Sequence, residues 1–314
     1  MHWLVERLRK IAAEDPKTIV LPEIDDERVV QAAQQLEKTG IARPVLLERS
    51  LMTEEKKQRY AQFYYEKRRH RHASAAEVLP LMDDPLYFAN MMVKTGDADG
   101  VVSGAVYTSG KVAQSTFRCL DIDPRCGIIT SCFLMALKDQ QYGEKGVFVY
   151  ADCGIVPYPD SSQLAGIALA AATFAEEVLK FEPKVACLSF SSKGSAQGEY
   201  VDKVIDAVAI AKQKRPGLKI DGELQVDSAI VPEIALKKVK GSEVAGQANI
   251  MIFPNLDAGN IAYKLTERLA DARALGPLLL GTVQPCSDLS RGCSVDDIVD
   301  CAAITVIKAQ MRQC

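Results

Sequence analysis

The stretch KTIVLPEIDDERVVQAAQQLEKTGIARPVLLE, residues 17–48, carries the pattern that decides the fold. KTIVLPE is a short apolar run typical of a buried strand, and DERVVQAAQQLEKTG places apolar residues at helical spacing. Gly40 closes that segment and predicts a helix C-cap, and ARPVLLE predicts a second strand. The stretch therefore predicts one strand–helix–strand unit.

The same alternation continues along the chain. Further short apolar runs are DGVVSGAV (99–106), GIITSCFLM (127–135), GVFVYADCGI (146–155), KVACLSFS (184–191), LKIDGEL (218–224), ANIMIFPN (248–255) and GPLLLGT (276–282). Amphipathic stretches lie between most of them, at residues 161–180, 198–214, 228–239 and 257–273. Near-continuous apolar strands separated by helices predict an α/β fold with parallel pairing. The polar stretch 137–146 is the best compositional hint of a domain boundary.

Composition narrows the class of protein. The 314 residues, 48% hydrophobic and 25% charged, suffice for one large or two ordinary globular domains. A net charge of −3 gives no broad basic surface for nucleic acid or membrane, so local arginines must hold any anionic substrate. Nine cysteines without a CxxC pair favour a reducing cytoplasm over a disulfide framework. The three histidines are not accompanied by other residues at metal-ligand spacing. No apolar run reaches the length of about 18 residues that spans a membrane.

Small polar residues follow several predicted strands. Ligands in open α/β sheets bind at the carboxyl ends of the strands. Ser103 and Gly104 follow one run, and the substrate-binding candidates Ser192, Lys193 and Asn260 follow two others. Such residues suit a site where backbone approaches an anion, although they are also ordinary loop residues. The P-loop, dinucleotide and nucleophile-elbow patterns are absent.

The stretch DLSRGCSVDDIV, residues 288–299, admits two interpretations. Ser294 precedes apolar residues at helical spacing, so it predicts an N-cap, and Asp297 stands where a capping box places its acid. Alternatively, Arg291 and the free amides of the helix start form an anion site, with the Ser290 hydroxyl beside it and a carboxylate to take a proton. That second arrangement suits acyl or phosphoryl transfer. The spacing alone leaves both open.

Long segments of the chain closely resemble the phosphate acetyl/butyryl transferase family, from about residue 15 to the end. The segments are residues 84–106, 185–196 and 221–265, followed by DLSRGCSVDDIV, in which LSRGCS favours the acetyl branch. The resemblance implies two α/β/α domains with a cleft between them that holds the site, similar to isocitrate and isopropylmalate dehydrogenases. It places the first domain at 1–130 plus 289–314 and the second at 131–288. It also implies a homodimer.

The resemblance implies the reaction acetyl-CoA + phosphate ⇌ acetyl phosphate + CoA, with direct thiolate attack in a ternary complex. Asp297 would then be the base for the thiol, Ser290 would bind the oxyanion or orient the thiol, and Arg291 would bind phosphate. The expected partners are these small molecules, not nucleic acid or membrane. No tightly bound cofactor or metal is expected, although some members respond to monovalent cations. A butyryl or propionyl transferase is the alternative; a regulatory binding domain and a metal-dependent dehydrogenase are less favoured.

Two further expectations concern charge. The family has two more arginines that bind substrate. One corresponds to Arg68. Gln114 stands where the other is usual, so Arg118, one turn later, is our candidate for reaching the same anion pocket.

Proton transfer from a thiol of pKa ~8.5 to a carboxylate of pKa ~3.9 is uphill, so burial must raise the pKa of Asp297 or arginines must lower that of the thiol. An acetyl-cysteine route at Cys293 is the other alternative. The helix start and Arg291 should lower the pKa of that thiol.

Overall fold

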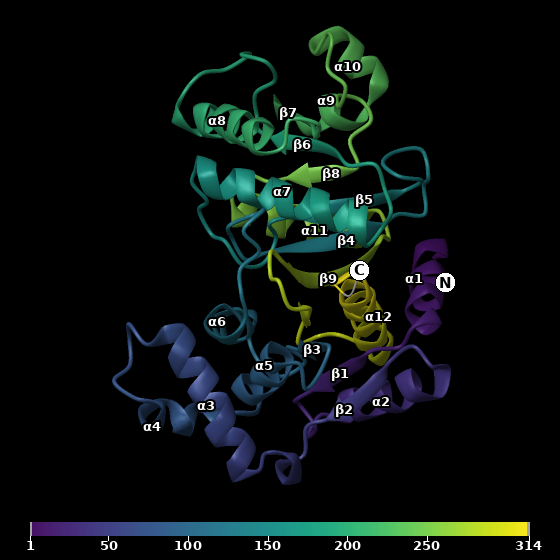
Figure 1. Cartoon of the computed structure of the whole chain (residues 1–314). Coiled ribbons are helices and arrows are strands. Elements are labelled where there is room, and N and C mark those ends of the chain that lie inside the picture. The colour runs from purple at the N-terminus through teal and green to yellow at the C-terminus, as the bar shows by residue number, and fades with distance from the viewer. Residues whose placement is uncertain (1, 313–314) are drawn as a thin grey trace. The chain divides into compact units, whose positions relative to one another are not determined.

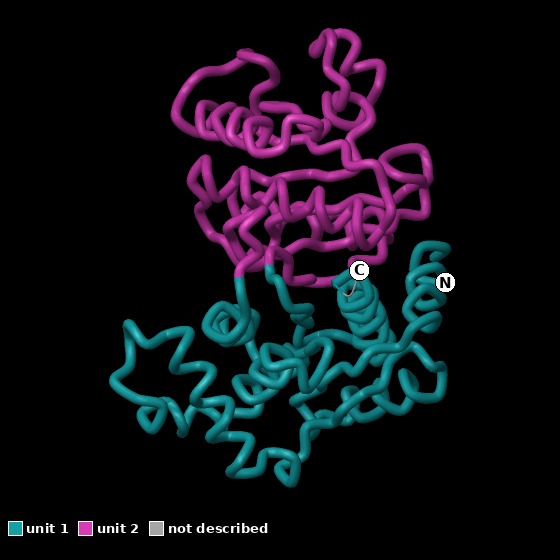
Figure 2. Tube along the Cα trace, viewed as in Figure 1, with its two compact units in different colours: residues 1–121, 282–314 teal, residues 122–281 magenta. Residues whose placement is uncertain are grey.

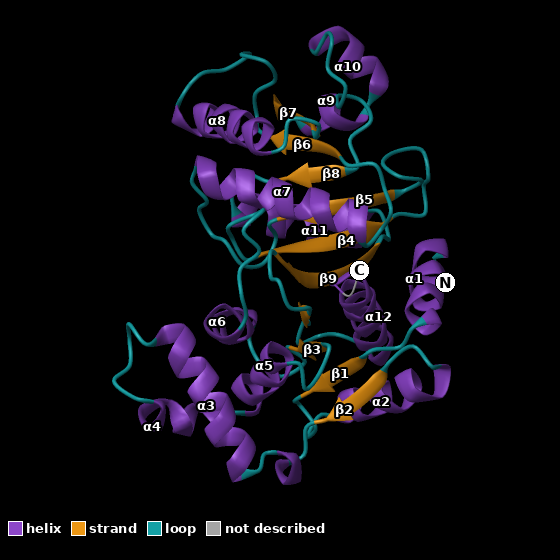
Figure 3. Cartoon of the chain, in the orientation of Figure 1, coloured by secondary structure: helices purple, strands orange, loops and turns teal. Residues whose placement is uncertain are grey.

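The computed structural model describes residues 2–312 and divides the chain into two compact units. Unit 1 consists of Met1–Asp121 and Thr282–Cys314, and unit 2 is Ile122–Gly281 (Figure 2). Each unit combines a β-sheet with helices (Figure 3). No helix within residues 2–312 is long and apolar enough to cross a membrane.

Unit 1 is built on a four-stranded sheet of order β10-β3-β1-β2, in which every pair is parallel (Figure 1). Its strands are β1 (Thr18–Leu21), β2 (Arg43–Leu46), β3 (Gly100–Ser103) and β10 (Cys286–Asp288). Helices α12 and α2 pack on this sheet, and α1 packs on α12. Helix α5 packs on β3 and α6 on β10, and α3 packs on α5. The helices are α1 (Trp3–Glu14), α2 (Glu27–Thr39), η1 (Arg49–Leu51), α3 (Glu54–Arg68), α4 (Ala75–Val78), η2 (Leu79–Asp83), α5 (Pro85–Thr95), α6 (Ser109–Cys119) and α12 (Val295–Arg312).

The first strand–helix–strand unit forms as its sequence predicts. Strands β1 and β2 pair in parallel, with Thr18 opposite Arg43, and α2 connects them. The side chain of Asp26 caps the start of α2, and Gly40 ends it in the left-handed conformation, with φ of 67°. Both the strand pair and the cap are therefore confirmed.

Unit 2 is built on a six-stranded sheet of order β7-β6-β8-β5-β4-β9. Its strands are β4 (Thr130–Ala136), β5 (Val147–Ala151), β6 (Lys184–Leu188), β7 (Lys219–Leu224), β8 (Ile250–Ile252) and β9 (Arg273–Leu280). Helices α7 and α8 cover one face, and α11 with α9 covers the other (Figure 1). The helices are α7 (Ser161–Glu177), α8 (Glu199–Lys214), α9 (Val226–Ile230), α10 (Pro232–Lys238) and α11 (Leu256–Leu269). This layering confirms the α/β class.

Strand β4 departs from the expected parallel pairing. It pairs antiparallel with both β5 and β9, whereas β5, β8, β6 and β7 form parallel pairs. The β4–β5 pair is antiparallel because the short connection 137–146 joins the two strands directly, without the crossover that a parallel pair needs. Gly143 and Gly146 turn this hairpin with φ of 65° and 84°. The polar stretch is thus a turn inside unit 2 and not a domain boundary.

The limits of the units differ from the predicted 1–130 plus 289–314 and 131–288. Residues 282–288 lie in unit 1, because Cys286–Asp288 form β10 and pair with β3, Asp288 opposite Ser103. At the other limit, Thr130 begins β4 of the unit 2 sheet. The predicted helix 228–239 is divided into α9 and α10 at Pro232, which supplies no backbone N–H to continue a helix.

Candidate functional site

The start of α12 is a capping box. Ser294 Oγ accepts a hydrogen bond from the N–H of Asp297 at 3.2 Å, and the N–H and Oγ of Ser294 donate to Asp297 Oδ2 at 2.9 and 2.8 Å. The structural interpretation of DLSRGCSVDDIV is therefore confirmed. The cap also fixes the Asp297 carboxylate at the first turn of the helix.

The adjacent aspartate has a different partner. Asp296 accepts a hydrogen bond from Arg9 Nη2 at 2.9 Å, and Arg9 Nε binds Asp300 at 2.6 Å. Asp300 is buried, so this pair ties α1 to α12. Asp296 and Asp297, although neighbours in sequence, thus serve separate contacts.

The turn before α12 presents Ser290 and Arg291 to solvent. Ser290 Oγ accepts a weak hydrogen bond from the N–H of Gly292 at 3.3 Å, and the N–H of Cys293 closes the turn on the Ser290 carbonyl at 2.9 Å. The side chain of Arg291 makes no hydrogen bond or ion pair within the described residues. An exposed hydroxyl and an unpaired guanidinium, side by side, are suited to bind an oxyanion.

Arg28, which the sequence analysis did not single out, holds this turn. Its Nη1 donates to the carbonyl oxygens of Arg291 and Cys293 at 2.9 and 2.7 Å. Its Nη2 donates to the Ala105 carbonyl at 3.0 Å, and Asp26 pairs with the same guanidinium at 2.7 Å. One side chain at the start of α2 therefore joins the loop after β3 to the turn before α12.

Glu23 is a second residue that the sequence analysis missed. Its buried carboxylate follows β1 and accepts four consecutive backbone N–H groups at 2.8–3.0 Å. The donors are Gly104, Ala105, Val106 and Tyr107. Successive N–H groups that converge in this way form an anion-binding nest. The only sequence signal was an acid directly after an apolar strand.

Asp288 ends β10 and is fully buried. Neither carboxylate oxygen meets hydrogen-bond geometry with any group in residues 2–312. Burial raises the pKa of Asp288 to about 7, and the nearby Ser109 hydroxyl and Leu289 N–H only partly oppose the rise. The charge of Glu23 raises this pKa further. A carboxyl with this environment lies two residues before Ser290.

The predicted substrate arginines lie on α3 and α6. Arg68 is in the last turn of α3, with its guanidinium carbon 5.9 Å from the centre of the Phe117 ring. Gln114 is exposed on α6. Both Arg68 and Arg118 lie close enough to Tyr64 to oppose the burial-driven rise of its pKa. The two arginines thus belong to one cluster, and a shared anion pocket stays a prediction.

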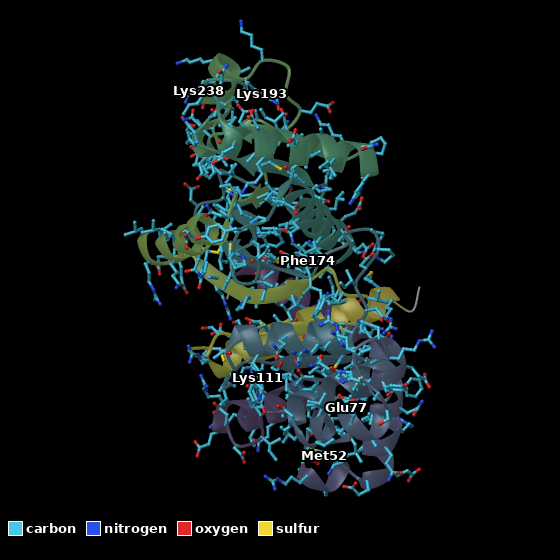
Figure 4. The ribbon with its side chains drawn as sticks, turned by 90° about the vertical axis from the view of Figure 1, so that its left-hand side faces the viewer. Met52, Glu77, Lys111, Phe174, Lys193 and Lys238 are labelled. Atoms are coloured by element: carbon cyan, nitrogen blue, oxygen red, sulfur yellow. The ribbon has the colours of Figure 1, made fainter. Side chains whose placement is uncertain are left out.

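Ser192 and Lys193 hold the loop after β6 to the end of β7. Ser192 Oγ accepts the N–H of Gln225 at 2.9 Å, and Lys193 forms an ion pair with Asp221. The buried Glu223 accepts the N–H of Gly194 at 2.7 Å in the same loop. Figure 4 labels Lys193, which lies in this loop of unit 2. Both predicted residues therefore have structural partners inside the unit.

Asn260 lies in the second turn of α11. Its amide donates to the Cys153 carbonyl at 3.1 Å and holds the loop that follows β5. Asp152, in that loop, accepts hydrogen bonds from the Thr130 and Ser131 hydroxyls at 2.6 Å. A substrate contact by Asn260 stays a prediction.

Cys293 has the wrong environment for a nucleophile. It is 6% exposed, and burial raises the pKa of its thiol to about 11 despite the nearby Arg28 guanidinium. The expected lowering of this pKa is therefore wrong, because burial outweighs the helix start and the arginine. The acetyl-cysteine route loses its main support.

The family model described as "Phosphate acetyl/butaryl transferase" matches residues 3–306, and the chain belongs to this family. The phosphate acetyltransferases of Acetivibrio thermocellus and Clostridium acetobutylicum are 46% and 43% identical to it, with 98% of each chain covered. The solved phosphotransacetylase from Streptococcus pyogenes matches with a TM-score of 0.90 at 36% identity over 98% of both chains. The EutD phosphotransacetylase from Staphylococcus aureus matches with a TM-score of 0.86, also at 36% identity and 98% coverage. The family expected from the sequence is confirmed.

Proposed function

We propose that the protein is a phosphate acetyltransferase, which transfers an acetyl group reversibly between CoA and inorganic phosphate. The observation that carries the proposal is 46% identity, over 98% of both chains, to a protein of that name. The exposed Ser290–Arg291 turn at the start of α12 supports it, because it offers an unpaired cation and a hydroxyl together.

In the proposed reaction, the CoA thiolate attacks the carbonyl carbon of acetyl phosphate. A carbon–sulfur bond forms, the carbon–oxygen bond to phosphate breaks, and phosphate leaves. Arg291 binds the phosphate, two of whose oxygens match the guanidinium fork. Ser290 donates to the developing oxyanion or orients the thiol.

Asp297 takes the thiol proton in this proposal. The capping hydrogen bonds from Ser294 support the role, since they hold the carboxylate in one position. At pH 7.5 roughly a tenth of a free thiol is already ionised, so general-base help accelerates the reaction without being indispensable.

The direct test mixes acetyl phosphate and CoA with purified protein, without added metal, and follows thioester absorbance. We expect rapid thioester formation by the wild type and a loss of several hundredfold in kcat/KM for Arg291→Ala, a typical range for a lost oxyanion donor being about 10²–10³. Arg49→Ala is the matched control, because Arg49 is another exposed arginine of unit 1. Absence of thioester with wild type would exclude the acetyl reaction. A preference for propionyl or butyryl phosphate would favour the alternative acyl transferase.

We also propose that the enzyme is a homodimer in the cytoplasm. Ile261, Leu265 and Leu269 are exposed at four-residue intervals on α11, and such an apolar stripe is suited to a second copy of the chain. The eight cysteines among residues 2–312 are buried and unpaired, which suits a reducing compartment. Light scattering of wild type and Leu265→Asp tests the dimer: equal masses for the two proteins would contradict this interface.

A further inference from the structure

Glu23 is a buried acid that pairs with backbone amides and not with a cation. It is 6% exposed and forms no ion pair within the described part of the chain. Its Oε2 accepts the N–H groups of Gly104 and Ala105 at 2.9 and 3.0 Å. Its Oε1 accepts those of Val106 and Tyr107, both at 2.8 Å. Because these N–H groups make no other hydrogen bond among the described residues, one carboxylate fixes four consecutive residues of the loop.

The loop of residues 104–107 is joined to the turn before α12 by two routes. Arg28 Nη2 donates to the Ala105 carbonyl at 3.0 Å, and its Nη1 donates to the Arg291 carbonyl at 2.9 Å. The second route is direct packing, since a Cβ added to Gly104 would lie 2.6 Å from the backbone nitrogen of Leu289. A displacement of the loop therefore also moves the backbone of the turn.

We propose that Glu23 is a positioning residue: through the 104–107 loop and Arg28, it fixes the backbone of Arg291 where the guanidinium can bind phosphate. Glu23 contacts no substrate in this role. It serves as an internal anion, in the place of the external anion that a nest of successive N–H groups binds. The inference rests on the proposed function, because it assumes that Arg291 binds the phosphate group of acetyl phosphate.

The role requires both carboxylate oxygens, since each accepts two N–H groups. Glu23→Gln keeps the shape of the side chain, but its amide nitrogen is a donor and leaves two N–H groups without an acceptor. We expect this variant to lower kcat/KM for acetyl phosphate about 10- to 100-fold, mainly through a higher KM, with little change in KM for CoA. A smaller folded fraction alone would lower kcat and leave KM unchanged, so the raised KM separates positioning from support of the fold.

Glu23→Ala leaves the nest empty, and formate carries the same two oxygens as the lost carboxylate. We expect added formate, but not chloride at the same concentration, to restore part of the kcat/KM of Glu23→Ala. Formate should not restore Glu23→Gln, because the glutamine side chain still fills the nest. Glu27→Gln is the matched control and should keep the wild-type kcat/KM: Glu27 begins α2 and is exposed, so its loss removes the same charge without touching the loop.

Thermal unfolding tests the nest without turnover. Formate should raise the unfolding temperature of Glu23→Ala and leave those of Glu23→Gln and wild type unchanged, because only the alanine variant has an empty nest. Folding of Glu23→Ala only when formate is present would support the proposal in the same way, and the kinetics of Glu23→Gln decide the case in which Glu23→Ala does not fold at all.

The two proposals fail in different ways. Wild type that forms no thioester contradicts the proposed function, whereas formate-dependent stabilisation of Glu23→Ala alone would still identify the nest. Wild type that forms thioester, together with an unchanged kcat/KM in Glu23→Gln, overturns only the positioning role. An equal effect of formate on Glu23→Ala and Glu23→Gln overturns it as well, since the anion would then act elsewhere.

Discussion

Arg28 Nη1 lies 2.7 Å from the carbonyl oxygen of Cys293, a residue 265 positions further along the chain. This bond closes the turn that carries Ser290 and Arg291 onto the start of α2. Because the same guanidinium also holds the carbonyls of Arg291 and Ala105, its removal leaves three backbone acceptors without their donor.

We therefore predict that Arg28→Ala lowers kcat by about 10²-fold, as misplacement of catalytic groups by an ångström does, while KM for CoA changes little. Arg28→Lys should recover little activity, because an ammonium cannot reproduce the planar fork. Steady-state kinetics with both substrates measures this, and added guanidinium should partly restore the alanine variant. Full activity in Arg28→Lys would show that only the charge matters.

Gly104 has the least room for a side chain in this region. Its φ is 113°, and a Cβ would come within 2.2 Å of Asp288 Oδ1 and 2.6 Å of the Leu289 nitrogen. We predict that Gly104→Ala destabilises the protein by about 3 kcal/mol, from strained backbone and displacement of β10. Gly110→Ala is the control: a Cβ there meets nothing within 4 Å, so it should change stability by less than about 1 kcal/mol. Denaturant titration compares the two, and equal midpoints would contradict the close packing.

Asp288 makes stability depend on pH. Its pKa is raised to about 7 in the folded protein, so the folded state keeps a proton that the unfolded state releases near pH 4. The stability from this proton is complete below about pH 4 and is lost as the pH rises through 7. Asp288→Asn, which is always neutral, should therefore gain on the wild type as the pH rises, by a few kcal/mol near pH 8.

Unfolding free energies at about pH 5 and pH 8 measure this gain. A difference between variant and wild type that is the same at both values would mean that Asp288 keeps one charge state throughout. Asn90→Ala serves as a control, since that buried amide does not titrate and its loss should cost the same at each pH.

Local patterns predicted the elements whose causes are local. The periodicity of residues 26–40 determines α2, and Gly40 ends it because only a residue without Cβ adopts φ of 67° freely. The spacing of three residues between Ser294 and Asp297 predicted the capping box, because both partners lie within one helical turn. The apolar run at β4 did not predict the strand direction, because such a run is the same in parallel and antiparallel pairs; the signal lay in the short polar connection 137–146.

The parts of the site that were missed depend on contacts distant in sequence. Glu23 meets the amides of residues 104–107 some eighty positions later, and no spacing rule reaches that far. β10 contains only Cys286, Ser287 and Asp288, which show no apolar period. For Cys293 the helix start and Arg291 were visible in the sequence, whereas the burial that decides the pKa of its thiol was not.

Asp297 and Ser294 separate the two interpretations of the motif. If Asp297 only caps α12, Asp297→Asn and Ser294→Ala should each cost about 1 kcal/mol of stability and little activity. If it accepts the thiol proton, Asp297→Asn should lower kcat by about 10²–10⁴-fold, whereas Ser294→Ala keeps the carboxylate and most of the rate. The base also predicts that the deficit of Asp297→Asn shrinks as the pH approaches the thiol pKa of ~8.5, since the thiolate then forms unaided. Rate–pH profiles of the two variants decide this, because a deficit that is equal in both variants and constant with pH belongs to the helix cap alone.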